Sequence, residues 1–254
     1  FPRDRLLQTQ DIAKIRESGI TRIEINALGT PSHLDIHDRA HISHTMSECR
    51  RQGISIVSMH SPGFPYKSDD EDVRKKAVAE GVLAAKVADE MGAEVLVCHL
   101  GINEQSEKSV TEMLDQLDGY SIKLGMENLH LDVPIYAAFV DRIASDQFGI
   151  VVDTGHPKDE DGVNPFVKQD RARETMAVCG EQLISLQLND WFDGDHVSPL
   201  DGNLQWGEVF AALKDIDYQG VLMFEAYRPP GQRELSPEYV LGKVASFPEA
   251  FVNR

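Results

Sequence analysis

Short apolar runs alternate along this chain with longer segments in which apolar residues recur at helical spacing. The apolar runs predict strands at 21–26, 54–60, 94–100, 123–128, 149–153, 183–189 and 220–225. The longer segments predict helices at about 38–52, 70–92, 104–120, 133–145 and 167–178, from about 207, and at about 237–251. A further helix at the start, with Thr9 as its N-cap, ends near Gly19. Alternation of strand and helix throughout is typical of a parallel α/β fold.

Many of the predicted strands end in a polar side chain. Glu127, Asp153, Gln187, Glu225 and His99 each close an apolar run. A carboxylate at the end of a buried strand is costly unless another group pairs with it. These strand ends meet at one site only if the strands lie side by side and point the same way. A parallel barrel with its chemistry at the carboxyl-terminal rim has that arrangement.

The fold class that follows is α/β, a (β/α)8 TIM barrel. The length of 254 residues and the mass of 28.3 kDa fit one such barrel of ~250 residues, so we expect a single domain over residues 1–254. The apolar runs predict seven strands, and the chain opens with the loop and helix that normally follow a first strand. We therefore predict a barrel that lacks its first strand or is truncated there.

Composition narrows the class of partner. The chain has 42 Asp and Glu against 25 Lys and Arg, a formal net charge of -17, so its surface repels a phosphate backbone and nucleic acid is not expected as a partner. No apolar run approaches the ~18 residues of a spanning helix, and no signal-peptide pattern opens the chain, so we expect no membrane partner. The three cysteines are odd in number and far apart, which indicates reduced thiols and a cytoplasmic protein.

Strand alternation turns four of the polar ends, Glu127, Asp153, Gln187 and Glu225, toward the same side of the sheet. Each acid alone is equally well explained as a helix cap or the partner of an arginine. Three carboxylates in one place, however, do not all stay ionised without a cation. Oxygen-rich ligation favours one Mn²⁺ or Mg²⁺ ion, with Co²⁺ and Zn²⁺ as alternatives.

Several short motifs make the chain resemble a known superfamily between about residue 10 and residue 228. The motifs are V-S-M-H-S-P at 57–62, V-C-H-L-G at 97–101, M-E-N at 126–128, D-T-G-H at 153–156, L-Q-L-N-D at 186–190, H-V-S-P-L-D-G-N-L-Q-W at 196–206 and M-F-E at 223–225. Their order and spacing resemble the xylose isomerase-like TIM-barrel superfamily of sugar isomerases, sugar epimerases and AP endonucleases.

The resemblance implies a metal site and an acid/base pair. Glu127, Asp153 and Glu225 match the metal-binding acids of the superfamily, while Gln187 stands where the fourth ligand is usually a histidine. An amide oxygen replaces imidazole for a hard cation and makes Zn²⁺ a poorer fit. Glu127 and Glu225 would also be the catalytic acid/base pair of a sugar or sugar phosphate isomerase or epimerase. Such an enzyme removes a proton next to a carbonyl through a metal-stabilised enediolate.

Two alternatives remain open from the sequence. Some superfamily members with Gln at this position resemble dehydratases or lyases that act on a keto-sugar, a cyclitol or a dehydroshikimate-like substrate. The other alternative is a non-catalytic sugar-binding subunit. All three readings expect a small carbohydrate as the ligand, and a homo-oligomer is compatible with each.

Five further residues are expected at the substrate. His156 matches a superfamily position that contacts substrate, with a rim histidine bonded to backbone as the alternative. Arg228 would hold a substrate oxygen or phosphate, and a surface ion pair explains it equally well. His60 and His99 match positions that bind additional zinc ions in the AP endonucleases; in single-metal relatives such residues line the pocket, which is the role we favour here. His196 is the fifth of these residues.

His196 also matches the third-zinc motif of the endonucleases. That motif requires an Asp two residues earlier, where this chain has Gly194. Together with Gln187 and the acidic composition, this departure argues against an endonuclease.

Overall fold

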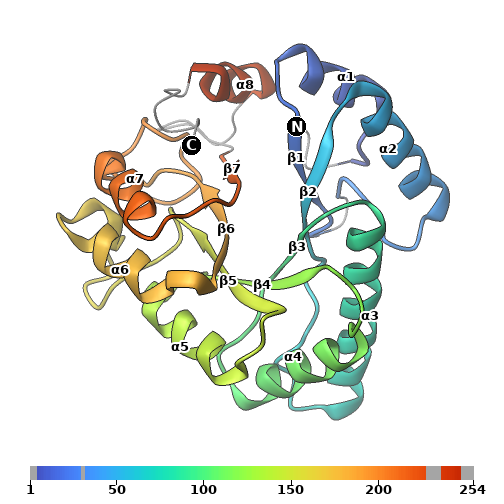
Figure 1. Cartoon of the computed structure of the whole chain (residues 1–254), viewed down its shortest axis with the longest axis horizontal. Helices are drawn as coiled ribbons and strands as arrows, with labels where there is room; N and C mark the ends of the chain where they lie inside the picture. The colour runs from blue at the N-terminus through green and yellow to red at the C-terminus, as the bar shows by residue number, and fades with distance from the viewer. Residues whose placement is uncertain (1–4, 30–31, 227–235, 247–254) are drawn as a thin grey trace. The chain divides into compact units, whose positions relative to one another are not determined.

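The computed structural model describes residues 5–29, 32–226 and 236–246, and within them strands and helices alternate (Figure 1). The strands are β1 (Arg22–Asn26), β2 (Ser55–His60), β3 (Val95–Cys98), β4 (Lys123–Glu127), β5 (Phe148–Asp153), β6 (Leu183–Leu188) and β7 (Leu222–Phe224). The helices are α1 (Thr9–Glu17), α2 (Arg39–Gln52), α3 (Glu71–Glu90), α4 (Glu104–Gln116), α5 (Val133–Ile143), α6 (Arg171–Cys179), α7 (Trp206–Asp215) and α8 (Pro237–Ser246). Two 3-10 turns, η1 (Pro165–Val167) and η2 (Gly180–Gln182), flank α6. The predicted alternation of strand and helix is therefore confirmed.

Two predicted helix starts were wrong, each for a local reason. The N-cap of α1 is Gln8 and not Thr9, because the Asp11 carboxylate accepts the Gln8 backbone N–H at 2.9 Å and closes the first turn one residue earlier. Helix α6 begins at Arg171, where the sequence predicted a start at 167. The Pro165–Val167 segment is a 3-10 turn, and Asp170 has a left-handed φ of 63° that interrupts the helix. The predicted end of the last helix, near 251, lies outside the described residues.

The chain divides into two compact units, Phe1–Met126 with Ile143–Gly149, and Glu127–Arg142 with Ile150–Arg254. In the first unit β1, β2, β3 and β4 pair in parallel in chain order. In the second unit β5, β6 and β7 also pair in parallel and in chain order. Their register sets Asp153 opposite Gln187 and Gln187 opposite Met223. Parallel pairing thus brings the carboxyl ends of neighbouring strands to the same edge, as predicted.

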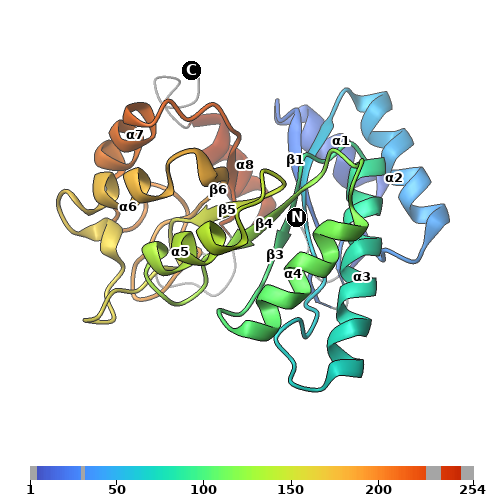
Figure 2. The same cartoon turned by 60° about the horizontal axis from the view of Figure 1, so that its bottom comes forward.

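In the first unit the long helix α3 packs on β3 and α4, and Figure 2 shows α3 and α4 side by side. Its inner face is made of small residues, among them Ala84, Ala85 and Ala88, which are fully buried. Gly81 continues this face, because a Cβ there would lie 2.5 Å from the Tyr66 hydroxyl oxygen. Small side chains therefore bring α3 close to the layer beneath it.

A buried arginine joins α3 to α4. The Arg74 side chain is only 1% exposed, and its guanidinium donates to both oxygens of Glu71 at 2.8 Å, to Glu112 at 2.6 Å and to the Ser109 hydroxyl at 3.2 Å. Each nitrogen of the buried guanidinium therefore has a hydrogen-bond partner.

We expect Arg74→Met to lower the free energy of unfolding by about 2–3 kcal/mol, because it removes charge-assisted bonds that Met does not replace. The matched control is Arg39→Met. Arg39 pairs with Glu90 at 2.7 Å, but its side chain is 58% exposed, so its loss should leave the unfolding transition unchanged. Urea unfolding of the three proteins measures this difference. Equal transitions for the two variants would contradict a stabilising role for the buried network.

Two further findings concern the whole described chain. Within it, none of the helices has the length and apolar character needed to cross a bilayer. Cys49, Cys98 and Cys179 are buried, and no disulfide joins them within the described residues. Burial raises the pKa of the Cys49 thiol to about 11 and that of Cys179 to about 12, so both stay protonated at neutral pH.

Candidate active site

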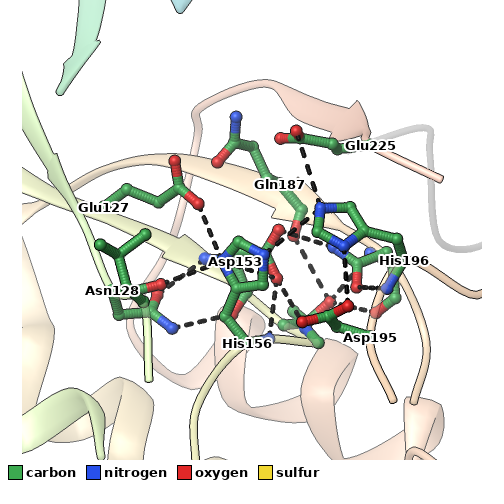
Figure 3. Close-up of polar contacts among 12 residues, drawn as sticks. Glu127, Asn128, Asp153, His156, Gln187, Asp195, His196 and Glu225 are labelled. Carbon is green, nitrogen blue, oxygen red and sulfur yellow. Dashed lines mark hydrogen bonds and ion pairs between the residues drawn. The ribbon is translucent and has the colours of Figure 1, made fainter. Parts of the chain in front are cut away.

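Four of the predicted site residues lie at or just beyond strand ends in the second unit. Glu127 and Asp153 are the last residues of β4 and β5, Gln187 is the next-to-last residue of β6, and all three are fully buried. The side chain of Glu225, which follows β7, is 14% exposed. The Glu225 backbone N–H donates to Leu188 O at 3.1 Å, which continues the ladder beyond β7. Figure 3 shows these side chains gathered around a pair of histidines.

The two histidines link the carboxylates into one chain of contacts. His156 Nδ1 lies 2.9 Å from Glu127 Oε1 and 3.8 Å from Asp153 Oδ1. The Nε2 atoms of His156 and His196 are 3.3 Å apart, and His196 Nε2 is 3.9 Å from Glu225 Oε1. The path from Glu127 to Glu225 therefore runs through two imidazole rings, as Figure 3 shows.

The turn after β5 holds His156 against the acids. Asp153 Oδ1 accepts the backbone N–H groups of Gly155 at 2.8 Å and of His156 at 3.0 Å, so the turn folds around the carboxylate. The Asn128 side chain fixes the Asp153 backbone: its Nδ2 donates to Asp153 O at 3.0 Å, and its Oδ1 accepts Asp153 N–H at 2.8 Å. The D-T-G-H sequence thus fixes the positions of both the Asp153 carboxylate and the His156 imidazole.

His196 comes from the long loop between β6 and α7, and its backbone has a φ of 58°. A left-handed φ in a residue other than glycine costs energy and persists only where the surroundings impose it. Here the His196 N–H donates to Asn189 Oδ1 at 2.9 Å, and His196 Nδ1 lies 3.0 Å from Asp195 Oδ1. These bonds turn the Nε2 atom toward His156 and Glu225.

The same loop is organised by Asp190, which is fully buried. Its Oδ1 accepts the backbone N–H groups of Trp191 at 2.8 Å and Leu204 at 2.9 Å, and its Oδ2 accepts Leu200 N–H at 3.0 Å and Trp206 Nε1–H at 2.7 Å. One carboxylate therefore fixes the beginning, the middle and the end of the loop that carries His196.

Burial and charge act against each other at this cluster. Burial raises the pKa of Asp153, and the nearby His156 and His196 offset part of this rise. For His156, burial alone would lower the pKa, but the carboxylates of Asp153, Glu127 and Glu225 outweigh it and raise the pKa to about 10. Without a bound cation, the His156 imidazolium therefore supplies the positive charge among the acids.

A raised histidine pKa has a stability consequence for the metal-free protein. The contribution of His156 is fully present below its unfolded pKa of about 6.5 and is lost as pH rises through about 10. We expect the melting temperature of metal-stripped protein to fall between pH 7 and pH 10, and His156→Asn to flatten this slope. Thermal melts in chelator across that range measure it; an identical slope in His156→Asn would exclude His156 as the titrating group.

The donor groups in this cluster fit a divalent cation. Three carboxylates, an amide and two imidazoles are gathered from one unit, and ligand atoms of Asp153, His156 and His196 all lie within 4.8 Å of one another. The predominance of oxygen donors suits Mn²⁺ or Mg²⁺. The three acids also exceed the two histidines in number, so the cluster favours added positive charge.

The remaining predicted residues are His60 and His99, which belong to the first unit, and Arg228. His60 and His99, in the first unit, contact each other with their Nε2 atoms 2.9 Å apart, and His60 Nδ1 is 3.8 Å from Glu24 Oε1. Glu24 in turn accepts the Ser58 hydroxyl at 2.7 Å. Arg228 lies outside the described residues.

Sequence reasoning missed the residues that orient the site. Asn128, Asn189, Asp190 and Asp195 hold the acids, the loop and His196 in place, but no role was assigned to them. Their signal was membership of two motifs, since Asn128 follows Glu127 in M-E-N and Asn189 and Asp190 follow Gln187 in L-Q-L-N-D.

Comparisons with known proteins agree with this fold. A curated protein of Methanocaldococcus jannaschii that is itself uncharacterized is 29% identical over 240 residues, covering 85% of this chain and 78% of that protein. The D-psicose 3-epimerase of Enterocloster bolteae is 27% identical over 116 residues, covering 46% of this chain and 32% of that enzyme. The crystal structure of a D-tagatose 3-epimerase-like protein matches with a TM-score of 0.70 at 26% identity, covering 87% of this chain and 86% of that one.

The epimerases among these relatives support the expectation of an isomerase or epimerase enzyme. The predicted TIM-barrel class is confirmed by the structural match and by the model of the family described as xylose isomerase-like TIM barrel, which matches residues 12–243. Because that match spans most of the chain, this protein belongs to the xylose isomerase-like TIM barrel family.

Proposed function

We propose that this chain is a divalent-metal-dependent sugar isomerase or epimerase that moves a proton on the carbon next to a carbonyl. The observation that carries the proposal is the placement of two carboxylates, Glu127 and Glu225, at the two ends of one histidine pair. An epimerase needs one group to remove a proton and a second to return it to the other face of the same carbon.

The proposal assigns proton transfer, metal binding and substrate contact to different side chains. Glu127 and Glu225 exchange the substrate proton, and His156 holds Glu127 through its Nδ1 atom. Glu127, Asp153, Gln187 and Glu225 would hold one Mn²⁺ or Mg²⁺ ion, which when bound polarises the carbonyl as a Lewis acid. His60, His99, His156, His196 and Arg228 are assigned to substrate contacts.

The remaining expectations are part of the same proposal. We propose a single domain over residues 1–254 that acts in the cytoplasm, where its three thiols stay reduced. The substrate is a small carbohydrate, for which the named relatives, D-psicose and D-tagatose 3-epimerase-like proteins, make free ketoses the first candidates. The net charge of -17 argues against nucleic acid as an alternative substrate.

One residue favours a second candidate function. Gln187 is fully buried as the next-to-last residue of β6. By the resemblance to the superfamily, it stands where the fourth ligand is usually a histidine. That change favours a dehydratase, which begins with the same proton removal and then eliminates water.

Incubation of the Mn²⁺-loaded protein with a panel of ketoses in D₂O tests the proposal. We expect deuterium on the carbon next to the carbonyl together with the epimeric or isomeric sugar, both absent after chelation. Loss of water with a new conjugated chromophore would instead identify the dehydratase. Binding of ketoses with neither deuterium nor product would leave a sugar-binding subunit and refute an enzyme.

A further inference from the structure

The two oxygens of the Asp153 carboxylate accept different numbers of hydrogen bonds. Its Oδ1 accepts two backbone N–H groups, from Gly155 and His156, whereas its Oδ2 accepts one side-chain donor, Asn189 Nδ2, at 2.6 Å. Each carboxylate oxygen has two lone pairs. Oδ1 is therefore filled by the turn, and Oδ2 keeps one lone pair beside its bond to Asn189.

The other end of the same amide holds the loop. Asn189 Oδ1 accepts the backbone N–H of His196 at 2.9 Å, at the residue whose φ is left-handed. A carboxylate only accepts and a backbone N–H only donates, so the orientation of the Asn189 amide is fixed by its two partners. Asn189 is fully buried, and no aliphatic or acidic side chain offers both a donor and an acceptor in this way.

The turn after β5 leaves room for this amide. A Cβ on Gly155 would lie 1.7 Å from Asn189 Oδ1, so a side chain there would displace the amide. The Thr154 hydroxyl also donates to Asn189 O at 2.6 Å. Gly155 and Thr154, in the turn after β5, therefore both accommodate Asn189.

We propose that Asn189 is a positioning residue that leaves Asp153 a single lone pair, on Oδ2, for the cation and ties this carboxylate to the backbone of His196. The first half rests on the proposed metal-dependent function; the second does not. Since residues that orient a ligating carboxylate change metal affinity by about 10–100-fold, the effect is measurable without any substrate.

Asn128 provides the matched control. Asn128 is fully buried like Asn189. Both ends of its amide bond to Asp153, but to the backbone N–H and C=O and not to the carboxylate. Asn128→Ala and Asn189→Ala therefore remove the same number of buried side-chain bonds. Both should lower the melting temperature, whereas only Asn189→Ala should free the carboxylate.

The first measurement is calorimetric titration of metal-stripped protein with Mn²⁺. We expect Asn189→Ala to weaken binding about 10–100-fold and Asn128→Ala to weaken it clearly less, because the bonds of Asn128 are to the Asp153 backbone and not to its carboxylate. Gly155→Ala, which keeps Asn189 but displaces its amide, should weaken binding as Asn189→Ala does. If Asn189→Ala does not fold, Asn189→Ser takes its place. Parent-like binding in Asn189→Ala, or equal weakening in both Asn variants, would overturn the first half.

The second measurement needs no metal. Long-range ¹H–¹⁵N spectra of the metal-free proteins report the imidazole nitrogens of His196. We expect these signals to move in Asn189→Ala and to stay in place in Asn128→Ala. Unmoved His196 signals in Asn189→Ala would overturn the tie between Asp153 and the loop. If the parent binds no Mn²⁺, the metal-dependent function and the assignment of the Oδ2 lone pair both fail. The His196 spectra still test whether Asn189 links Asp153 to the loop.

Discussion

Glu225→Gln is expected to lower kcat by about 10²–10⁴-fold, the range that a positioned general acid or base contributes. The amide has the size of the carboxylate but does not accept a proton at neutral pH. Glu225 is also a proposed ligand, so the variant should retain less than the parent's full Mn²⁺ content. Full retention of the ion with parent activity would remove Glu225 from the site.

Isotope exchange separates the two roles of Glu225. If Glu127 and Glu225 serve opposite faces, Glu225→Gln should still exchange deuterium into one epimer at saturating Mn²⁺ while failing to interconvert the two. Glu127→Gln should show the reverse preference. Glu160→Gln, at an exposed acid in the β5–α6 loop, removes the same charge and should match the parent. Equal exchange into both epimers by Glu225→Gln would show that one residue serves both faces.

Asp190→Asn is expected to lower the free energy of unfolding by about 3–5 kcal/mol, the largest stability effect we predict. The carboxylate accepts four N–H groups, two on each oxygen. An amide keeps one acceptor oxygen and points its own N–H₂ at the other two donors, so buried donors lose their partner. Because Trp206 Nε1 is one of the four, tryptophan fluorescence should shift as well.

The control lies in the same loop. Asp193 is exposed and has a φ of 52°, a conformation that Asn adopts as readily as Asp. Asp193→Asn should therefore unfold with the parent's midpoint in urea. If Asp190→Asn does the same, the four bonds to Asp190 contribute no net stability, and another contact must order the loop.

The elements were predictable from the sequence because their signals are local. Apolar runs and helical spacing located every strand of the described chain to within a few residues. The errors fell where a single residue changes the backbone: Asp170 stops a helix by its left-handed φ, and Asp11 moves a cap by one position. Neither effect is visible in the periodicity of apolar residues.

The candidate site was predictable only in part. The acids stood out because a charge at the end of an apolar run is unusual, and the parallel register then aligned Asp153 with Gln187. The residues that orient them did not, because their bonds join distant parts of the chain. Asn128 and Asn189 reach Asp153 across 25 and 36 residues, and no pattern in one sequence connects such pairs.

The bonds to Asp190 make its loop a candidate for engineering. All four end within sixteen residues of Asp190, so the segment carries its own internal framework. Phe192 is 47% exposed and takes part in none of the four bonds. A library randomised at Phe192 should therefore retain the fold while it samples new side chains in the loop that carries His196, which makes the loop a starting point for directed evolution of the proposed activity.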